Sequence, residues 1–113
     1  MLIAAYGPLP IVRDIFAGID GVEQAYIYGS WAARAEGAPG KVSQDVDVLL
    51  VGRADADAVF EAAADASTIL GFEVNARSVR PERWVDPGDD QFVRQVKGSP
   101  LVLARFDRAA VSA

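Results

Sequence analysis

The sequence predicts one layered α/β (α+β) domain, built on a small mixed β-sheet with helices packed on one face. Segments with the two-residue alternation of β-strands take turns along the chain with segments in which apolar residues recur at helical spacing. The chain of 113 residues is the size of one ordinary domain and is long enough to bury a core. We therefore expect residues 1–113 to form a single domain.

The first part of the chain predicts a helix, a strand and a second short helix. Apolar residues recur at helical spacing within residues 8–21, after a proline that favours a helix start. Residues 22–29 carry alternating and aromatic β-formers and stop at a glycine, which predicts a strand. A serine suited to cap a helix opens residues 30–37, and we expect residues 38–44 to be a loop.

The second part predicts the centre of the sheet. Residues 45–52 alternate at first and then become continuously apolar, which is typical of a central strand. Residues 54–71 begin with acidic residues and end at a glycine, so they predict the longest helix. Residues 72–79 predict a half-buried strand. The remaining segments predict a turn-rich connection, a short helix and a short final strand (residues 80–90, 91–98 and 99–106).

The composition excludes several kinds of chemistry. The chain has no cysteine and no histidine, which removes disulfides, thiolate nucleophiles, Cys/His zinc sites and imidazole acid–base catalysis. Any metal must therefore be held by oxygen atoms, which favours Mg²⁺, Mn²⁺ or Ca²⁺. The net charge of −5 opposes binding to phosphate backbones, so we expect no direct contact with nucleic acid.

The sequence also indicates where the protein works. No apolar run approaches the ~20 residues that a membrane-spanning helix needs, so we expect no membrane segment. The N-terminus lacks a basic region before its apolar residues and contains prolines among them, so we expect no signal peptide. These features predict a cytoplasmic protein.

Two aspartates lie at the start of the predicted central strand, where strand propensity disfavours them. Asp45 and Asp47 are two residues apart and should point to one face, with Val46 and Val48 directed to the core. Two ionised carboxylates this close repel each other unless a cation lies between them. The pair therefore indicates a divalent-ion site. The alternative is a strand end at which Asp45 caps the loop and Asp47 meets solvent.

Gly29 and Ser30 lie at the junction between a predicted strand and a predicted helix. Backbone N–H groups and the positive end of the helix dipole meet at such a junction. Gly29 lets the backbone approach a ligand closely, and the hydroxyl of Ser30 can donate to a phosphate oxygen. The alternative is a glycine turn followed by a serine N-cap. Together with the aspartates, the pair indicates an anion site on one strand and a metal site on the next.

This pattern resembles the signature of the polymerase-β-like minimal nucleotidyltransferases, or MNT-type domains. The likeness runs from about residue 7 to residue 106. The chain also resembles the nucleotidyltransferase-like domain that follows a winged helix in some prokaryotic regulators. It is carried by Gly29-Ser30, by the aspartates Asp45 and Asp47, and by four segments (residues 21–37, 45–52, 71–84 and 92–103).

The resemblance implies a site and an activity. Gly29 and Ser30 would hold the triphosphate of a nucleoside triphosphate, and Asp45 and Asp47 would bind Mg²⁺ or Mn²⁺. The implied reaction moves a nucleoside monophosphate, AMP from ATP above all, to a hydroxyl of a protein or small molecule. A third carboxylate on a neighbouring strand activates that hydroxyl. If Glu73 takes this role the site is complete; if the position corresponds to Asn75, the base is missing.

Two other functions fit the same resemblance. One is a non-catalytic nucleotide-binding regulatory module, and the other is an antitoxin-like interaction domain that pairs with a helical toxin. A protein partner, whether toxin-like or acceptor, or a homodimer is expected in each case, because one small domain cannot enclose an acceptor alone. The third acid distinguishes the enzyme from the other two.

Overall fold

The computed structural model describes residues 8–35 and 45–106, in which helices and strands alternate largely as predicted. The loop predicted over residues 38–44 lies outside the described residues. The helices are α2 (Leu9–Ala17), α3 (Gly29–Ala35), α4 (Ala56–Leu70), α5 (Pro81–Val85) and α6 (Gln91–Lys97), and the strands are β1 (Val22–Tyr28), β2 (Asp45–Gly52), β3 (Glu73–Val79) and β4 (Val102–Phe106).

The strands form one mixed sheet with the order β3-β2-β1-β4. β1 runs antiparallel to both of its neighbours, β2 and β4, whereas β2 and β3 are parallel. A parallel pair needs a crossover connection, and α4 supplies it. β2 is therefore an inner strand, as its continuous apolar run predicted.

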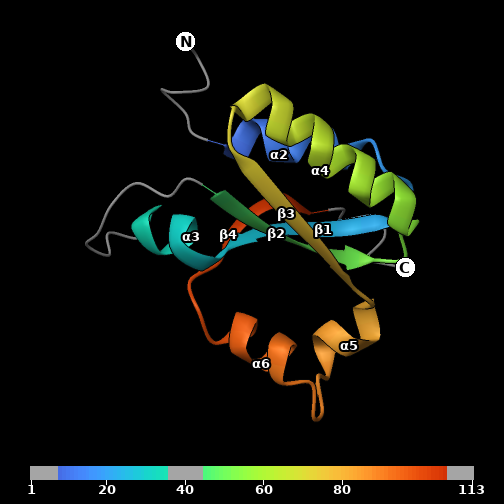
Figure 1. The fold of residues 1–113 in the computed structure, drawn as a ribbon. Coiled ribbons are helices and arrows are strands. Elements are labelled where there is room, and N and C mark those ends of the chain that lie inside the picture. Colours follow the sequence, from blue (N-terminus) through green and yellow to red (C-terminus); the bar gives the residue numbers. More distant parts are fainter. Residues whose placement is uncertain (1–7, 36–44, 107–113) are drawn as a thin grey trace.

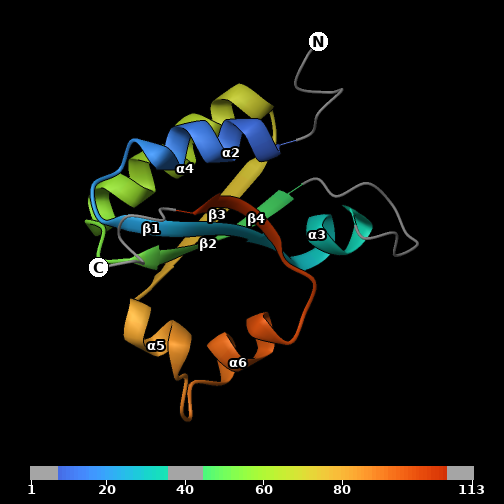
Figure 2. The ribbon, with the colours of Figure 1, turned by 180° about the vertical axis from the view of Figure 1, so that it is seen from behind.

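The helices lie on both sides of this sheet. α2 and α4 pack against each other and cover one face, and α5 and α6 lie against the other face (Figures 1 and 2). The predicted mixed sheet is confirmed, and α2 and α4 cover one of its faces as expected, but helices also lie on the other face. The two short helices add a partial third layer, and α3 extends from the end of β1 (Figure 1).

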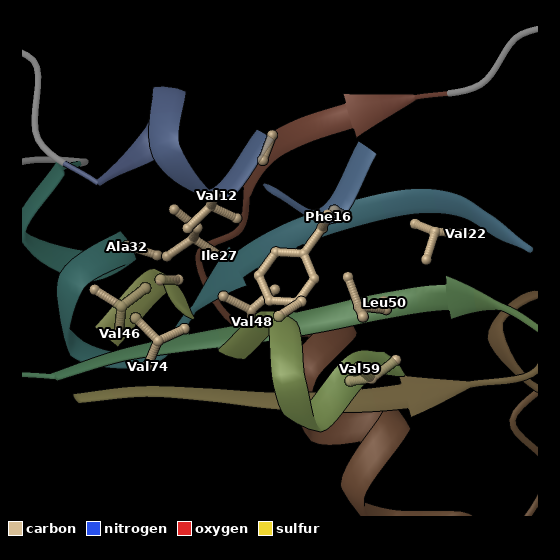
Figure 3. Close-up of a cluster of buried hydrophobic side chains, with 14 residues drawn as sticks. Val12, Phe16, Val22, Ile27, Ala32, Val46, Val48, Leu50, Val59 and Val74 are labelled. Atoms are coloured by element: carbon tan, nitrogen blue, oxygen red, sulfur yellow. The ribbon is translucent and has the colours of Figure 1, made fainter. Parts of the chain in front are cut away.

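The main core lies between the sheet and the pair α2 and α4. Phe16 of α2 is fully buried and lies over Val48 and Leu50 of β2 (Figure 3). α4 contributes Val59 and the fully buried Ala66 to the same core. Small side chains allow α4 to pack close to the sheet, because the distance between packed elements depends on the side chains at the contact. This core fixes the strands that carry the candidate site.

α4 is the longest described helix and shows both predicted end signals. Asp55 accepts a hydrogen bond from the backbone N–H of Ala58 at 3.0 Å, which caps the first turn. Gly71 ends the helix in the left-handed conformation with φ +79°. Within residues 8–35 and 45–106, no helix is long and apolar enough to cross a membrane.

The connection predicted as turn-rich over residues 80–90 contains the five-residue helix α5. Pro81 lies in its first turn, where a backbone N–H has no intrahelical partner, so proline loses no hydrogen bond there. The backbone N–H groups of Arg83 and Trp84 both donate to the carbonyl of Arg80 at 3.0 Å. A helix this short is missed because it does not repeat an apolar position often enough for helical spacing to show.

We expect Leu50→Ala to lower the free energy of unfolding by about 2–5 kcal/mol, because Leu50 is 1% exposed and its loss leaves a cavity in the main core. Leu103→Ala is the matched control, since Leu103 also lies in a strand but is 49% exposed. Its cost should be about 1 kcal/mol or less. Urea unfolding followed by tryptophan fluorescence measures both. Equal losses for the two variants would contradict the position of the core.

Candidate functional site

The two aspartates of β2 lie on the face of the sheet that points away from the main core. Val46 and Val48, which alternate with them, are fully buried in that core. Asp45 is exposed and Asp47 is half-buried. The predicted alternation of β2 is therefore confirmed. The strand end presents two carboxylates on one face, with α-carbons about 7 Å apart by strand geometry.

Gly29 lies directly against Asp47. The antiparallel register of β1 and β2 places Tyr28 opposite Asp47, and Gly29 is the next residue of the chain. A Cβ atom built on Gly29 would lie 2.6 Å from Oδ2 of Asp47, and the backbone φ of Gly29 is +77°. Only glycine fits such a position without strain. The predicted phosphate turn and one predicted metal ligand are thus in contact.

Ser30 follows in the first turn of α3, which begins at Gly29 rather than at Ser30. The helix is seven residues long and packs against β1 and β2. Trp31 is partly buried against the main core, which anchors this turn to the sheet. Gly29 and Ser30 are therefore held beside the strand end that carries the two aspartates.

The parallel register of β2 and β3 places the two candidates for the third acid. Asp45 lies opposite Glu73, and Asp47 lies opposite Asn75. Glu73 and Asn75 are both exposed and, being two residues apart, share one face. The residue level with Asp47 is therefore an amide. Glu73 lies two residues before Asn75, at the start of the same strand.

The environment of Asp47 raises the pKa of its carboxyl. Burial is the largest cause, and the negative charge of Asp45 acts in the same direction. A hydrogen bond from the side chain of Asn75 opposes them by stabilising the ionised form, and the charge of Glu73 adds a smaller upward contribution. A cation bound between the two aspartates would remove the repulsion.

The donor set fits a small hard cation. Mg²⁺ is commonly held by one or two carboxylates, with substrate phosphates and water as its other ligands. Asp45 and Asp47 supply two carboxylates, and the turn at Gly29 supplies a place for phosphate beside them. Within residues 8–35 and 45–106, no group of three or more acidic, histidine or cysteine side chains is arranged to hold a metal ion.

Aromatic and cationic side chains that the sequence did not single out lie next to these residues. Tyr28 and Phe92 of α6 meet edge to face with ring centroids 6.0 Å apart. The guanidinium carbon of Arg77 lies 3.9 Å from the centroid of Phe92. Burial raises the pKa of Tyr28, and the charge of Asp47 raises it further. The signal in the sequence is the alternation of β1, which places Tyr28 on the face of Asp47.

A cavity of about 230 Å³ opens beside this cluster. Gly29 and Tyr28 form one side of it, and residues from α6 and the turn after it form the other. The lining residues are Tyr28, Gly29, Phe92, Gln95, Val96 and Ser99. The cavity therefore adjoins the backbone turn that contacts Asp47.

We expect Gly29→Ala to destabilise the fold more than Gly71→Ala. Both glycines have nearly the same positive φ, +77° and +79°, so both substitutions incur about 1–2 kcal/mol of backbone strain. Only the new Cβ at residue 29 collides with a carboxylate, because nothing lies within 4 Å of the corresponding position at residue 71. In an Asp47→Ala background the extra cost of Gly29→Ala should largely disappear. Chemical denaturation of the four variants measures this coupling, and additive losses would contradict the contact.

We expect carbon-13 NMR titration to show the pKa of Asp47 above the ordinary value of 3.8. Asp45→Asn should lower that pKa, because it removes a neighbouring negative charge, and Asn75→Ala should raise it further, because it removes a hydrogen bond to the ionised form.

The same raised pKa has a consequence for stability. The contribution of Asp47 is fully present below pH 3.8 and is lost as the pH rises through the pKa of the folded state. Asp47→Asn should therefore gain stability over the wild type across that rise. If Asp45→Asn and Asn75→Ala shifted the pKa of Asp47 in the same direction, the causes assigned to its raised pKa would be wrong.

Comparison with known proteins identifies the fold. No family model matches the sequence, and no curated protein matches it. Among solved structures, a chain of a toxin–antitoxin complex with AMP-PNP has a TM-score of 0.61 at 14% identity, over 94% of this chain and 78% of that one. A mutant MntA–HpeT toxin–antitoxin structure has a TM-score of 0.61 at 13% identity, with the same coverage of 94% and 78%.

A third similar structure is the complex of a tri-AMPylated HEPN toxin from Shewanella oneidensis with an MNT antitoxin. It has a TM-score of 0.52 at 14% identity, over 90% of this chain and 69% of that one. Identities this low show the fold alone. The fold expected from the sequence is confirmed: the chain has the fold of an MNT-type nucleotidyltransferase domain.

Proposed function

We propose that this domain is a nucleotidyltransferase that needs a divalent cation and moves a nucleoside monophosphate, AMP from ATP above all, to a hydroxyl of a protein or small molecule. The contact between Gly29 and Oδ2 of Asp47 carries the proposal. It places a backbone turn that a phosphate can approach closely beside a carboxylate that is repelled by Asp45. The fold supports it, since one similar structure is a toxin–antitoxin complex with AMP-PNP.

In this proposal the chain's own residues first bind and orient the nucleotide. The backbone of Gly29 and the hydroxyl of Ser30 donate to phosphate oxygens. Asp45 and Asp47 hold Mg²⁺ or Mn²⁺, which supplies positive charge to the phosphates when bound. A chain of net charge −5 repels a free triphosphate, so the cation is also needed for binding. Positioning and charge together supply most of the catalysis of phosphoryl transfer.

The transfer itself then needs a proton acceptor. The acceptor's hydroxyl oxygen forms a bond to the α-phosphorus, and the bond from that phosphorus to the bridging oxygen breaks. Pyrophosphate leaves with the electron pair, and the hydroxyl proton passes to the carboxylate of Glu73. Glu73 is the acid of β3 that lies next to Asp45 on the face of the two aspartates.

A second candidate function is a nucleotide-binding or antitoxin-like module that does not catalyse transfer. One observation favours it: the residue level with Asp47 on β3 is Asn75, which cannot accept a proton as a carboxylate does. The similar structures are toxin–antitoxin proteins, and one is a complex with a HEPN toxin. In this case the partner is a toxin and the site holds a nucleotide without turning it over.

One experiment separates the two functions. ATP binding is measured by calorimetry with and without Mg²⁺, and transfer is measured with ATP labelled on the α-phosphate in cell lysate. We expect Mg²⁺-dependent binding by the wild type, and a loss of about tenfold or more in Asp47→Asn, equal to about 1.4 kcal/mol. Glu73→Gln should retain binding but lower transfer by about 10²–10⁴-fold, the usual contribution of a general base.

Glu61→Gln is the matched control, because Glu61 is exposed on α4 and its substitution removes the same charge at a position away from the site. It should retain both activities. Absence of any Mg²⁺-dependent binding by the wild type would overturn both functions. Binding without labelled product would favour the second candidate, and undiminished transfer by Glu73→Gln would exclude that residue as the proton acceptor.

A further inference from the structure

β3 is one edge of the described sheet, and its outer side borders a groove beneath α4. The groove has a volume of about 650 Å³ and lies between this helix and this strand. Phe60 of α4 lines the groove and is 75% exposed. Its neighbours along α4 are mostly small (Ala56, Ala63, Ala64 and Ser67). Edge strand, small helix face and exposed phenylalanine together form one surface, which we call the β3 edge.

The charges on the β3 edge are complementary to a second copy of themselves. Glu73 and Arg77 are both exposed, point to the same face and lie on either side of Asn75. If two β3 strands run antiparallel with Asn75 on the two-fold axis, Glu73 of each copy stands directly opposite the partner's Arg77. Opposite charges at directly opposed positions stabilise an antiparallel pair. The symmetry forms this ion pair twice.

We propose that the β3 edge binds the β3 edge of a second copy of this chain, in an antiparallel register centred on Asn75. The interface is isologous, so both copies use the same residues. The outward backbone N–H and C=O groups of β3 gain partners, and the two sheets become continuous. Phe60 of each copy enters the groove of the other beneath α4, and the small residues of α4 leave room for it.

The signs of the charges on β3 decide whether this edge strand pairs with a second copy or repels it. Exposed edge strands are often blunted by like charges, which repel a second copy. On β3 the two charges are opposite, so they repel a second copy only in the wrong register. Shifting the pairing by two residues removes Glu73 from Arg77 and so separates the ion pairs. The charge pattern therefore selects one register as well as one partner.

The side chain of Arg77 is already held by a contact within its own chain. Its guanidinium lies over the ring of Phe92 at 3.9 Å, a contact that uses the flat face of the group. The N–H donors lie in the plane of the guanidinium, so stacking through its flat face does not use them. Stacking thus reduces the conformational freedom that Arg77 would lose on pairing with a carboxylate of the second copy.

Pairing through β3 also affects the candidate site. The partner's Arg77 would lie beside Glu73, and Glu73 is the register partner of Asp45 on the next strand. Both candidate sites would open on the same face of the continuous sheet, since α4 covers the other face (Figure 1). The inference uses the edge, the groove and the charges, and does not depend on the proposed function.

Sedimentation equilibrium with a charge-reversal cycle tests the proposal. We expect the wild type to be a dimer that dissociates on dilution. Arg77→Glu should weaken the dimer by about tenfold or more, because it places two carboxylates opposite each other twice. The double variant Glu73→Arg/Arg77→Glu should restore the dimer, because it reverses both charges together. Arg83→Glu is the matched control, since Arg83 is exposed on α5 and should leave the dimer unchanged.

Hydrogen exchange locates the interface. Backbone amides of β3 should exchange more slowly above the dissociation constant than below it, and Phe60→Ser should remove that difference. Circular dichroism checks that each variant is folded. A wild type that stays monomeric at about 0.1 mM, where a modest dimer would form, would overturn the proposal. So would a dimer that survives Arg77→Glu, or one whose β3 amides are not protected.

Discussion

The close approach of Gly29 to the carboxylate of Asp47 is the constraint on which the candidate site depends. It requires the β1–β2 register that places Tyr28 opposite Asp47, and it requires a residue without a Cβ at a positive φ. The register in turn depends on the main core, since slipping it by one residue would expose Val46 and Val48 and bury the aspartates. Packing on one face of the sheet thus fixes the chemistry on the other.

Local patterns predicted what lies on a single strand or at a single turn. The alternation of β2 predicted that Val46 and Val48 face the core, and the structure confirms it. The roles of Gly29, Ser30, Asp45 and Asp47 stay predictions, although the structure brings the four positions together at adjacent strand ends. Strand end, turn and periodicity are all short-range properties, and a sequence records them directly.

Relations between distant segments could not be predicted in the same way. The register of β3 against β2 decides whether Glu73 or Asn75 lies opposite Asp47. It depends on how α4, which connects the two strands, packs over the sheet, and no local pattern encodes it. The same holds for Arg77, which meets Phe92 only after α6 folds over the second face. The short helix α5 was missed because one turn carries no period. Tertiary packing therefore sets which of the two residues lies level with Asp47, and the role of the third acid stays a prediction.

The register also explains why an amide stands level with Asp47. A carboxylate there would add a fourth negative charge to those of Asp45, Asp47 and Glu73, where burial and repulsion already raise the pKa of Asp47. Asn75 instead donates a hydrogen bond that favours the ionised form of Asp47 and so opposes part of that rise in pKa. The position of the acid then matters: Glu73 lies beside the exposed Asp45, where solvent weakens the repulsion. The amide thus lies beside the half-buried Asp47, and the acid lies beside the exposed Asp45.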